Sequence, residues 1–253
     1  MKIPVIIDLE PGEEALVPLG LLARSPDFEI RAVTFSRCSE GKMDPQSLKN
    51  RLAALGVDAP VAGDGGLSPV SLMEKVISGG EAPAILAWGP LSNVAALLLT
   101  QPEGKEKIRC VSFAGGSLRG GDATVAAERN VFADPEALDI VLRSGVKTFM
   151  APLELNEALS QLDLWQRIGG NRGRMLRDLC AALVLSRPDL FRVRELYVET
   201  ELGGEFCRGS TVADFKGQLE RKANVSVLEA FDFERLSAIL TDLFGPCGQE
   251  VRA

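Results

Sequence analysis

The 253-residue sequence contains no histidine, so it lacks the most common general acid–base side chain and the most common transition-metal ligand. Its five cysteines are scattered and show no C-x-x-C spacing, which excludes an obvious zinc site or disulfide framework. We expect these thiols to be reduced and mostly structural. Any chemistry must therefore use carboxylates, Arg, Lys, Tyr, amides or a hard cation.

Positive charge is also scarce, with 28 Lys and Arg against 35 Asp and Glu, a net charge of −7 and a pI near 4.9. Neutralising phosphates requires clustered Lys and Arg, so nucleic acid is not an expected partner. No segment approaches roughly eighteen uninterrupted apolar residues, and the N-terminus enters a strand without the regions of a signal peptide. We therefore expect a cytoplasmic protein with no membrane association.

The sequence does have the composition of a large α/β domain, with 46% hydrophobic and 25% charged residues, and we predict a single domain over residues 1–253. Short apolar strands alternate with amphipathic helices, which is typical of a doubly wound, mostly parallel, Rossmann-like sheet. The expected strands are 3–7, 28–35, 59–62, 84–88, 108–114 and 146–150. The expected helices between them are 16–23, 44–55, 67–78, 91–99 and one that starts with Asp134 as its N-cap.

The pattern changes in the C-terminal part of the chain. The pattern predicts mainly helical structure over residues 154–186, including 175–185, and a final helix at 232–243. Between these helices, three segments alternate around glycine-rich turns at 195–201, 205–214 and 221–229. This alternation predicts a small antiparallel strand meander rather than further strand–helix–strand units.

Acidic residues crowd the end of the first strand, which is apolar enough to be buried on both faces. Asp8, Glu10, Glu13 and Glu14 follow the apolar run at once, where open α/β sheets keep their ligand crevice. Such a cluster needs a cation, a proton or a polyhydroxylated ligand. The alternative for Glu13 and Glu14 is a place in the first turn of the next helix, where negative charge favours the helix dipole.

Other polar residues have simpler structural interpretations. The polar, glycine-rich segment 117–132 leaves a strand end and is long enough to be functional. We interpret Asp134 and Glu136 as charges at a helix start, and Asn93 as a residue that satisfies backbone groups near another helix start.

Five blocks follow one another along the chain in an informative order. They are DLEPGEEA at 8–15; GPLSN at 89–93; GG at 115–116 with ERN at 128–130 and ADPEA at 133–137; RDL at 177–179 with PDLF at 188–191; and RGSTVAD at 208–214. In this order the chain resembles the inosine-uridine preferring nucleoside hydrolases from its first strand to its last helix. The resemblance implies the α/β nucleoside hydrolase fold and hydrolysis of a ribonucleoside to ribose and free base.

The resemblance also implies a calcium site. It places Glu10 as both a metal ligand and the catalytic base, Asp178 as the late ligand, the backbone carbonyl of Trp88 as a further ligand, and Asp8 beside them. These groups leave much of the usual 6–8 oxygen shell of Ca²⁺ to water and substrate, so we expect weak binding of the ion. The longer side chain of Glu10 in place of an aspartate is expected to lower the rate.

Two further differences from the family pattern affect residues that would take part in catalysis. Ungapped matching places Glu14 on the first acid of the family's D-D pair and Ala15 on a calcium ligand, whereas a one-residue gap would place Glu13 and Glu14 on the pair; we prefer the ungapped register. Arg177 replaces the family's histidine, and it can stabilise an anion but cannot donate a proton usefully near neutral pH.

The resemblance assigns ribose contacts to Glu128 and Asn130, with Asp122 where the family has another asparagine and Asp8 nearby. The family's flap after the third strand is shortened to residues 63–66. The predicted partner is a nucleoside or ribose, and the resemblance leaves the base preference and a dimeric or tetrameric assembly open.

Three hypotheses remain open from the sequence. The first is an N-ribosyl hydrolase with altered chemistry. The second is an inactive relative that keeps the fold to bind a ligand or a protein partner, with Arg177 neutralising the acids in place of calcium. The third, by fold analogy alone, is a phosphotransferase of the haloacid dehalogenase type, which has D-x-D after its first strand.

Overall fold

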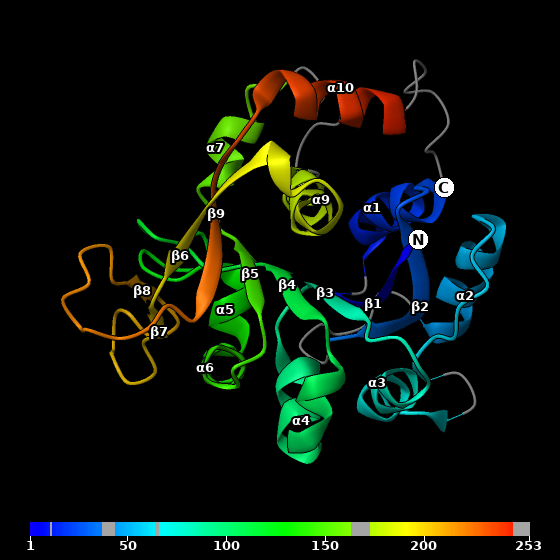
Figure 1. Cartoon of the computed structure of the whole chain (residues 1–253), viewed down its shortest axis with the longest axis horizontal. Coiled ribbons are helices and arrows are strands. Elements are labelled where there is room, and N and C mark those ends of the chain that lie inside the picture. The colour runs from blue at the N-terminus through cyan, green and yellow to red at the C-terminus, as the bar shows by residue number, and fades with distance from the viewer. Residues whose placement is uncertain (11, 37–43, 64–65, 163–172, 245–253) are drawn as a thin grey trace.

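The computed structural model describes residues 1–10, 12–36, 44–63, 66–162 and 173–244. A seven-stranded sheet crosses the molecule in the order β2-β1-β3-β4-β5-β9-β6 (Figure 1). All neighbouring pairs are parallel except β9 with the edge strand β6. The strands are β1 (Ile3–Leu9), β2 (Phe28–Phe35), β3 (Ala84–Trp88), β4 (Cys110–Ala114), β5 (Thr148–Ala151), β6 (Phe191–Leu196) and β9 (Val225–Phe231). The predicted doubly wound, mostly parallel sheet is confirmed.

The central strands are buried on both faces because nearly all of their residues are apolar. In β1, Val5 and Ile7 pack into one hydrophobic cluster, while Ile6 between them packs into a second cluster on the other face. The same alternation in β3 sends Leu86 to the first cluster and Ile85 to the second. Successive side chains of a strand point to opposite faces, so a continuous apolar run requires helices on both sides.

Helices cover the two faces of the sheet, as Figure 1 shows. One layer contains α1 (Glu13–Arg24), α2 (Pro45–Ala54), α7 (Leu155–Leu159), α9 (Gly173–Ser186) and α10 (Phe233–Phe244). The other layer contains α3 (Pro69–Ser78), α4 (Ser92–Thr100), α5 (Arg129–Ala133) and α6 (Pro135–Arg143). Two short 3₁₀ helices, η2 (Pro102–Lys107) and η4 (Pro188–Leu190), connect elements.

Helix starts follow the expected capping chemistry. Asp44, Ser68 and Asp134 each accept a hydrogen bond from a backbone N–H in the first turn of α2, α3 and α6, and a proline follows each cap. An N-cap oxygen satisfies one of the free N–H groups at a helix start, and proline fits the first helical position. The predicted N-cap role of Asp134 is confirmed.

Two local predictions need correction. Residues 59–62 do not form a strand. Val61 makes only an isolated bridge with Val33, on the edge of β2 that no other strand covers. Helix α1 begins at Glu13 rather than Leu16, so both glutamates lie in its first turn. The earlier start follows from the chain leaving β1 by a very short connection. The part of the predicted 154–186 helical region at 163–172 lies outside the described residues.

The predicted small antiparallel sheet in the C-terminal part is present, but it has two strands rather than three segments. Only β7 (Val198–Thr200) and β8 (Thr211–Ala213) form a separate antiparallel sheet. Strand β9 instead joins the main sheet, parallel to β5 and antiparallel to β6. Its first four residues are all buried, which favours a place between two strands rather than in an exposed hairpin.

Cys110 and Cys180 are buried free thiols, and Cys207 is an exposed one, while Cys38 and Cys247 lie outside the described residues. Within the described ranges, no helix is both long and apolar enough to span a membrane.

The turn after β4 depends on glycine. Gly116 has φ +73°, and a Cβ at this position would lie 2.5 Å from the Cε atom of Met150. Gly145 has a similar φ of +81°, but an added Cβ would meet nothing within 4 Å. Alanine substitutions at the two positions therefore distinguish the cost of a left-handed backbone from the cost of steric overlap.

We predict that Gly145→Ala costs about 1–2 kcal/mol of unfolding free energy, the cost of the left-handed backbone alone. Gly116→Ala is expected to cost about 1 kcal/mol more, because the terminal methyl group of the buried Met150 side chain has to shift to make room. Chemical denaturation of both variants measures the difference, and equal losses would contradict the packing at this turn.

Candidate functional site

Asp8 lies near the carboxyl end of β1 and is fully buried. Its Oδ1 atom accepts hydrogen bonds from Thr34 Oγ1 at 2.7 Å and Asn93 Nδ2 at 2.9 Å. Its Oδ2 atom is buried and has no hydrogen-bond partner among the described residues. Burial raises the pKa of Asp8 from 3.8 to about 6, although the bonds from Asn93 and Thr34 oppose the shift.

Strand register explains why these three side chains meet. Asp8 pairs with Thr34 of β2 in the parallel ladder, and β3 lies on the other side of β1. Asn93 follows β3 in the first turn of α4, and its amide also donates to the Phe35 carbonyl. Asn93 therefore satisfies a backbone group, but this group lies at the end of β2 and not at a helix start as predicted. Asn93 also contacts the Asp8 carboxylate, which the sequence did not reveal.

Glu10 leaves the same strand end and forms an ion pair with Arg129, the first residue of α5. Both side chains are partly exposed, at 31% for Glu10 and 43% for Arg129. The backbone N–H of Glu10 donates to the Trp88 carbonyl at 3.3 Å. The carbonyl that the resemblance assigns to a metal is therefore already hydrogen-bonded.

A second ion pair is completely buried. Arg177 of α9 donates to Glu128 Oε1 at 2.7 Å, and the side chains are 1% and 0% exposed. The other oxygen of Glu128 accepts from the backbone N–H groups of Gly116, Asn130 and Val131, so Glu128 also caps α5. Burial alone would lower the pKa of Arg177, but the charge and hydrogen bond of Glu128 outweigh it and raise that pKa.

Asp178, next to Arg177 on α9, shares this environment. Burial raises the pKa of Asp178 to about 7, against the lowering effect of Arg177 and Arg174. The charges of Glu128 and Glu10 raise this pKa further. Asp178 therefore lies within electrostatic range of acids that come from the β1 end and from α5.

The remaining predicted ribose contacts hold the loop before α5. Asp122 Oδ1 accepts from the backbone N–H of Arg129 at 2.8 Å, and Asn130 Nδ2 donates to the Ala114 carbonyl at 2.7 Å. These bonds tie the loop and α5 to the carboxyl end of β4. Asp122 and Asn130 thus have structural partners in addition to any ligand they contact.

Glu14 is placed only through its backbone, in the first turn of α1, and its side chain lies outside the described part of the structure. Ala15 is 8% exposed and packs in the hydrophobic cluster beneath α1. In the ungapped register, a buried methyl group therefore stands where the resemblance implies a calcium ligand.

The described donor set does not fit calcium. Calcium takes about 6–8 oxygen ligands. Of the four predicted ligands, Glu10 pairs with a guanidinium and the Trp88 carbonyl already accepts a backbone N–H. Asp8 uses Oδ1 for Thr34 and Asn93, so Asp8 Oδ2 and Asp178 are the remaining donors of this set. Among the residues whose side chains are described, no group of three or more acidic, Cys or His residues could hold a metal ion.

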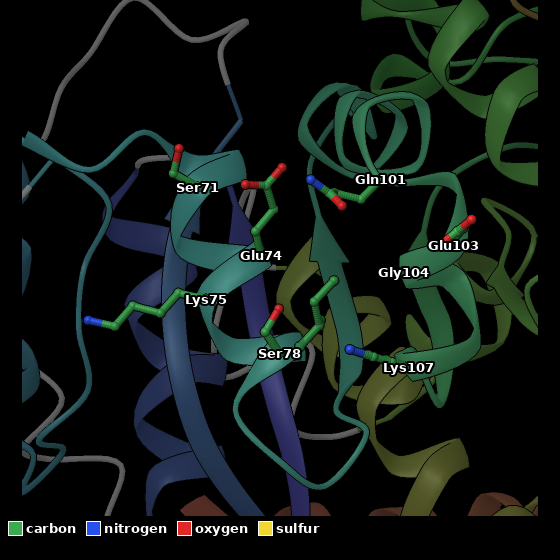
Figure 2. A pocket seen from close by; sticks show the side chains of 9 residues that line it. Ser71, Glu74, Lys75, Ser78, Gln101, Glu103, Gly104 and Lys107 are labelled. Carbon is green, nitrogen blue, oxygen red and sulfur yellow. The ribbon is translucent and has the colours of Figure 1, made fainter.

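A separate pocket lies between α3 and η2, where η2 leads into the amino end of β4 (Figure 2). Its volume is about 470 Å³, and Lys75 and Lys107 line it together with Glu74 and Glu103. None of the acids described above lines this pocket. The carboxyl edge, where open α/β sheets bind ligands, remains the candidate site.

Comparison with known proteins points to one family. The family model for the inosine-uridine preferring nucleoside hydrolases matches residues 66–238. A pyrimidine-specific ribonucleoside hydrolase, RihA of Enterobacter sp. (strain 638), is 29% identical over 308 aligned residues, covering 96% of this chain and 97% of that protein. RihA of Escherichia coli (strain SMS-3-5 / SECEC) is 28% identical, with 96% and 98% coverage.

Solved structures agree on the fold. A plant nucleoside hydrolase, PpNRh1, superposes with a TM-score of 0.79 at 20% identity, covering 97% of this chain and all of that chain. An inosine-guanosine nucleoside hydrolase superposes with the same TM-score at 21% identity, covering 96% and 98%.

We predict that Asp8→Asn stabilises the protein near neutral pH. The raised pKa means that the contribution of Asp8 to stability is fully present below about pH 4 and is lost as the pH rises through about 6. Asparagine keeps an oxygen for Thr34 and Asn93 without a buried charge, so we expect a gain of about 1–3 kcal/mol at about pH 7.5. Urea denaturation across this pH range measures the effect, and a loss of stability at neutral pH would contradict it.

We also predict that Glu128→Gln costs about 3–5 kcal/mol, because it leaves the buried Arg177 charge without its carboxylate. The matched control is Glu29→Gln, which breaks an exposed pair with Arg31 and should cost less than about 1 kcal/mol. Denaturation midpoints compare the two, and similar losses would be inconsistent with a buried pair.

Proposed function

The chain belongs to the inosine-uridine preferring nucleoside hydrolase family, and from this membership we propose that it hydrolyses the N-glycosidic bond of a ribonucleoside, releasing ribose and a free base. The observation that carries the proposal is the gathering of acids from separate elements at the carboxyl edge of the sheet. Asp8 and Glu10 come from the β1 end, and Asp178 comes from α9 with its pKa raised to about 7.

The proposed chemistry uses these carboxylates around a ribose. Cleavage of a ribosyl bond passes through an oxocarbenium-like transition state, whose positive charge nearby carboxylates stabilise. Glu10 accepts a proton from the attacking water while the water oxygen forms a bond to C1′. The C1′–N bond breaks, and the departing base takes the electron pair. We assign Glu14 to the catalytic acids together with Glu10, and Asp122, Glu128 and Asn130 to the surroundings of the ribose.

Arg177 stands where the family has a histidine, and we assign the proton donation of that histidine to the neighbouring Asp178. Arg177 is buried against Glu128 and keeps its charge, so it supports the acids electrostatically and does not supply a proton. Asp178 has a pKa of about 7, so part of its population is protonated near neutral pH. We propose that Asp178 is the proton donor for the leaving base.

The named relatives guide the choice of substrate. The RihA proteins are described as pyrimidine-specific, so a pyrimidine ribonucleoside is the first substrate to test here. Action on a free nucleoside in the cytoplasm, by a dimer or tetramer, is part of the same proposal.

One observation favours a second function, binding of a ribosyl ligand without turnover. Glu10 is paired with Arg129, so the Glu10 carboxylate has to separate from the guanidinium before it can accept a proton from water. The two functions differ in whether free base is released.

The test is incubation of the protein with uridine, cytidine and inosine, with free base measured by chromatography and ribose by a reducing-sugar assay. We expect slow release of uracil, and a decrease of roughly 10²–10⁴-fold in Glu10→Gln, the usual contribution of a general base. Glu29→Gln is the matched surface control. If ribose stabilises the folded protein but no base is released, the binding function is favoured. If ribose gives no stabilisation and no base is released, both the hydrolase and the binding function are refuted.

A further inference from the structure

We propose that Arg129 takes the place of a metal ion at Glu10, so that the site binds its ribosyl ligand without calcium. This inference deepens the proposed function and rests on it for the class of ligand. Four observations on the described residues carry it, namely the fixed position of Arg129, the charge balance of the acids, the state of the oxygen donors, and the free capacity of the guanidinium.

Arg129 is held in place from both sides. It is the first residue of α5, directly after the cap residue Glu128, and its backbone N–H donates to Asp122 at 2.8 Å. Glu128 in turn is fixed by Arg177 and by three backbone N–H groups. The guanidinium of Arg129 therefore reaches Glu10 from a braced backbone position rather than from a mobile surface loop.

The acids of the site already have positive charge beside them. Arg129 pairs with Glu10 and Arg177 pairs with Glu128, while Arg177 and Arg174 lower the pKa of Asp178. A divalent cation that enters this cluster meets guanidinium groups that cannot lose their charge. To bind Glu10, it must also displace Arg129.

Most of the oxygen atoms around the site already accept hydrogen bonds. Glu128 uses both carboxylate oxygens and the Trp88 carbonyl accepts a backbone N–H. Asp8 uses Oδ1 for Thr34 and Asn93, which leaves its Oδ2 atom and Asp178 as the remaining donors among the predicted ligands. Calcium affinity depends on the number of charged oxygen ligands, and this set leaves too few for a tight site.

The guanidinium can do part of what a cation would do for a diol. Arginine has five N–H donors in a planar fork, of which Glu10 takes one end. The side chain is 43% exposed, so its other donors are accessible to ribose hydroxyls. Arg129 thus acts as a positioning residue that orients Glu10 and the sugar together.

The first experiment is a calorimetric titration of EDTA-treated protein with CaCl₂. We expect no stoichiometric calcium site, and a tight one-to-one site would overturn the inference. In parallel, the thermal shift produced by ribose should be equal in EDTA and in calcium. A shift that appears only with calcium would also overturn it.

The second experiment compares three variants by the same thermal shift in EDTA. Arg129→Met should weaken the apparent affinity for ribose about tenfold or more, since it removes charge-assisted hydrogen bonds. Arg129→Lys should recover part of the shift by keeping the charge. Arg31→Met, which breaks an exposed ion pair elsewhere, is the control and should match the parent protein. Undiminished ribose binding in folded Arg129→Met would refute the role of Arg129.

The outcomes separate this inference from the proposed function. If the protein has no calcium site and binds ribose in EDTA but releases no base, only the proposed hydrolase activity is refuted. A protein that releases base only when calcium is present refutes only the replacement of the metal by Arg129.

Discussion

The buried ion pair between Arg177 and Glu128 is the interaction on which the site depends. It connects α9 on one face of the sheet to α5, which belongs to the opposite layer. Glu128 also caps α5 and binds the backbone N–H of Gly116 at the end of β4. Because a buried charge is tolerated only when it is paired, this bond sets how the two layers meet at the carboxyl edge.

The same edge holds charges that do not favour stability. Asp8 is fully buried with one oxygen unpaired among the described residues, and burial raises the pKa of both Asp8 and Asp178. Perturbed carboxylates of this kind concentrate at functional sites, where their protonation matters more than folding energy. Arginines lie beside two of the acids at this edge, Arg129 with Glu10 and Arg177 with Glu128, and they offset part of its negative charge.

Much of the fold could be predicted because its signals are local. The strands Phe28–Phe35 and Ala84–Trp88 have the predicted bounds. Apolar and polar residues alternate at the start of the first, whereas the second is one continuous apolar run that is buried throughout. The N-cap at Asp134 was also predictable, because capping requires only a short side chain and the next turn of helix. The place of β9 in the main sheet could not be predicted, because its parallel pairing with β5, in addition to its antiparallel pairing with β6, depends on residues far away in the chain.

By itself, the sequence determined the fold class, the order of the elements and the presence of acids after the first strand, because periodicity and capping act over a few residues. The tertiary structure alone decided which charges meet. Arg129 reaches Glu10 across 119 residues, Asn93 reaches Asp8 across 85, and Arg177 reaches Glu128 across 49. These pairs form because parallel strands bring their carboxyl ends to one edge, and no local pattern encodes which side chains will face each other there.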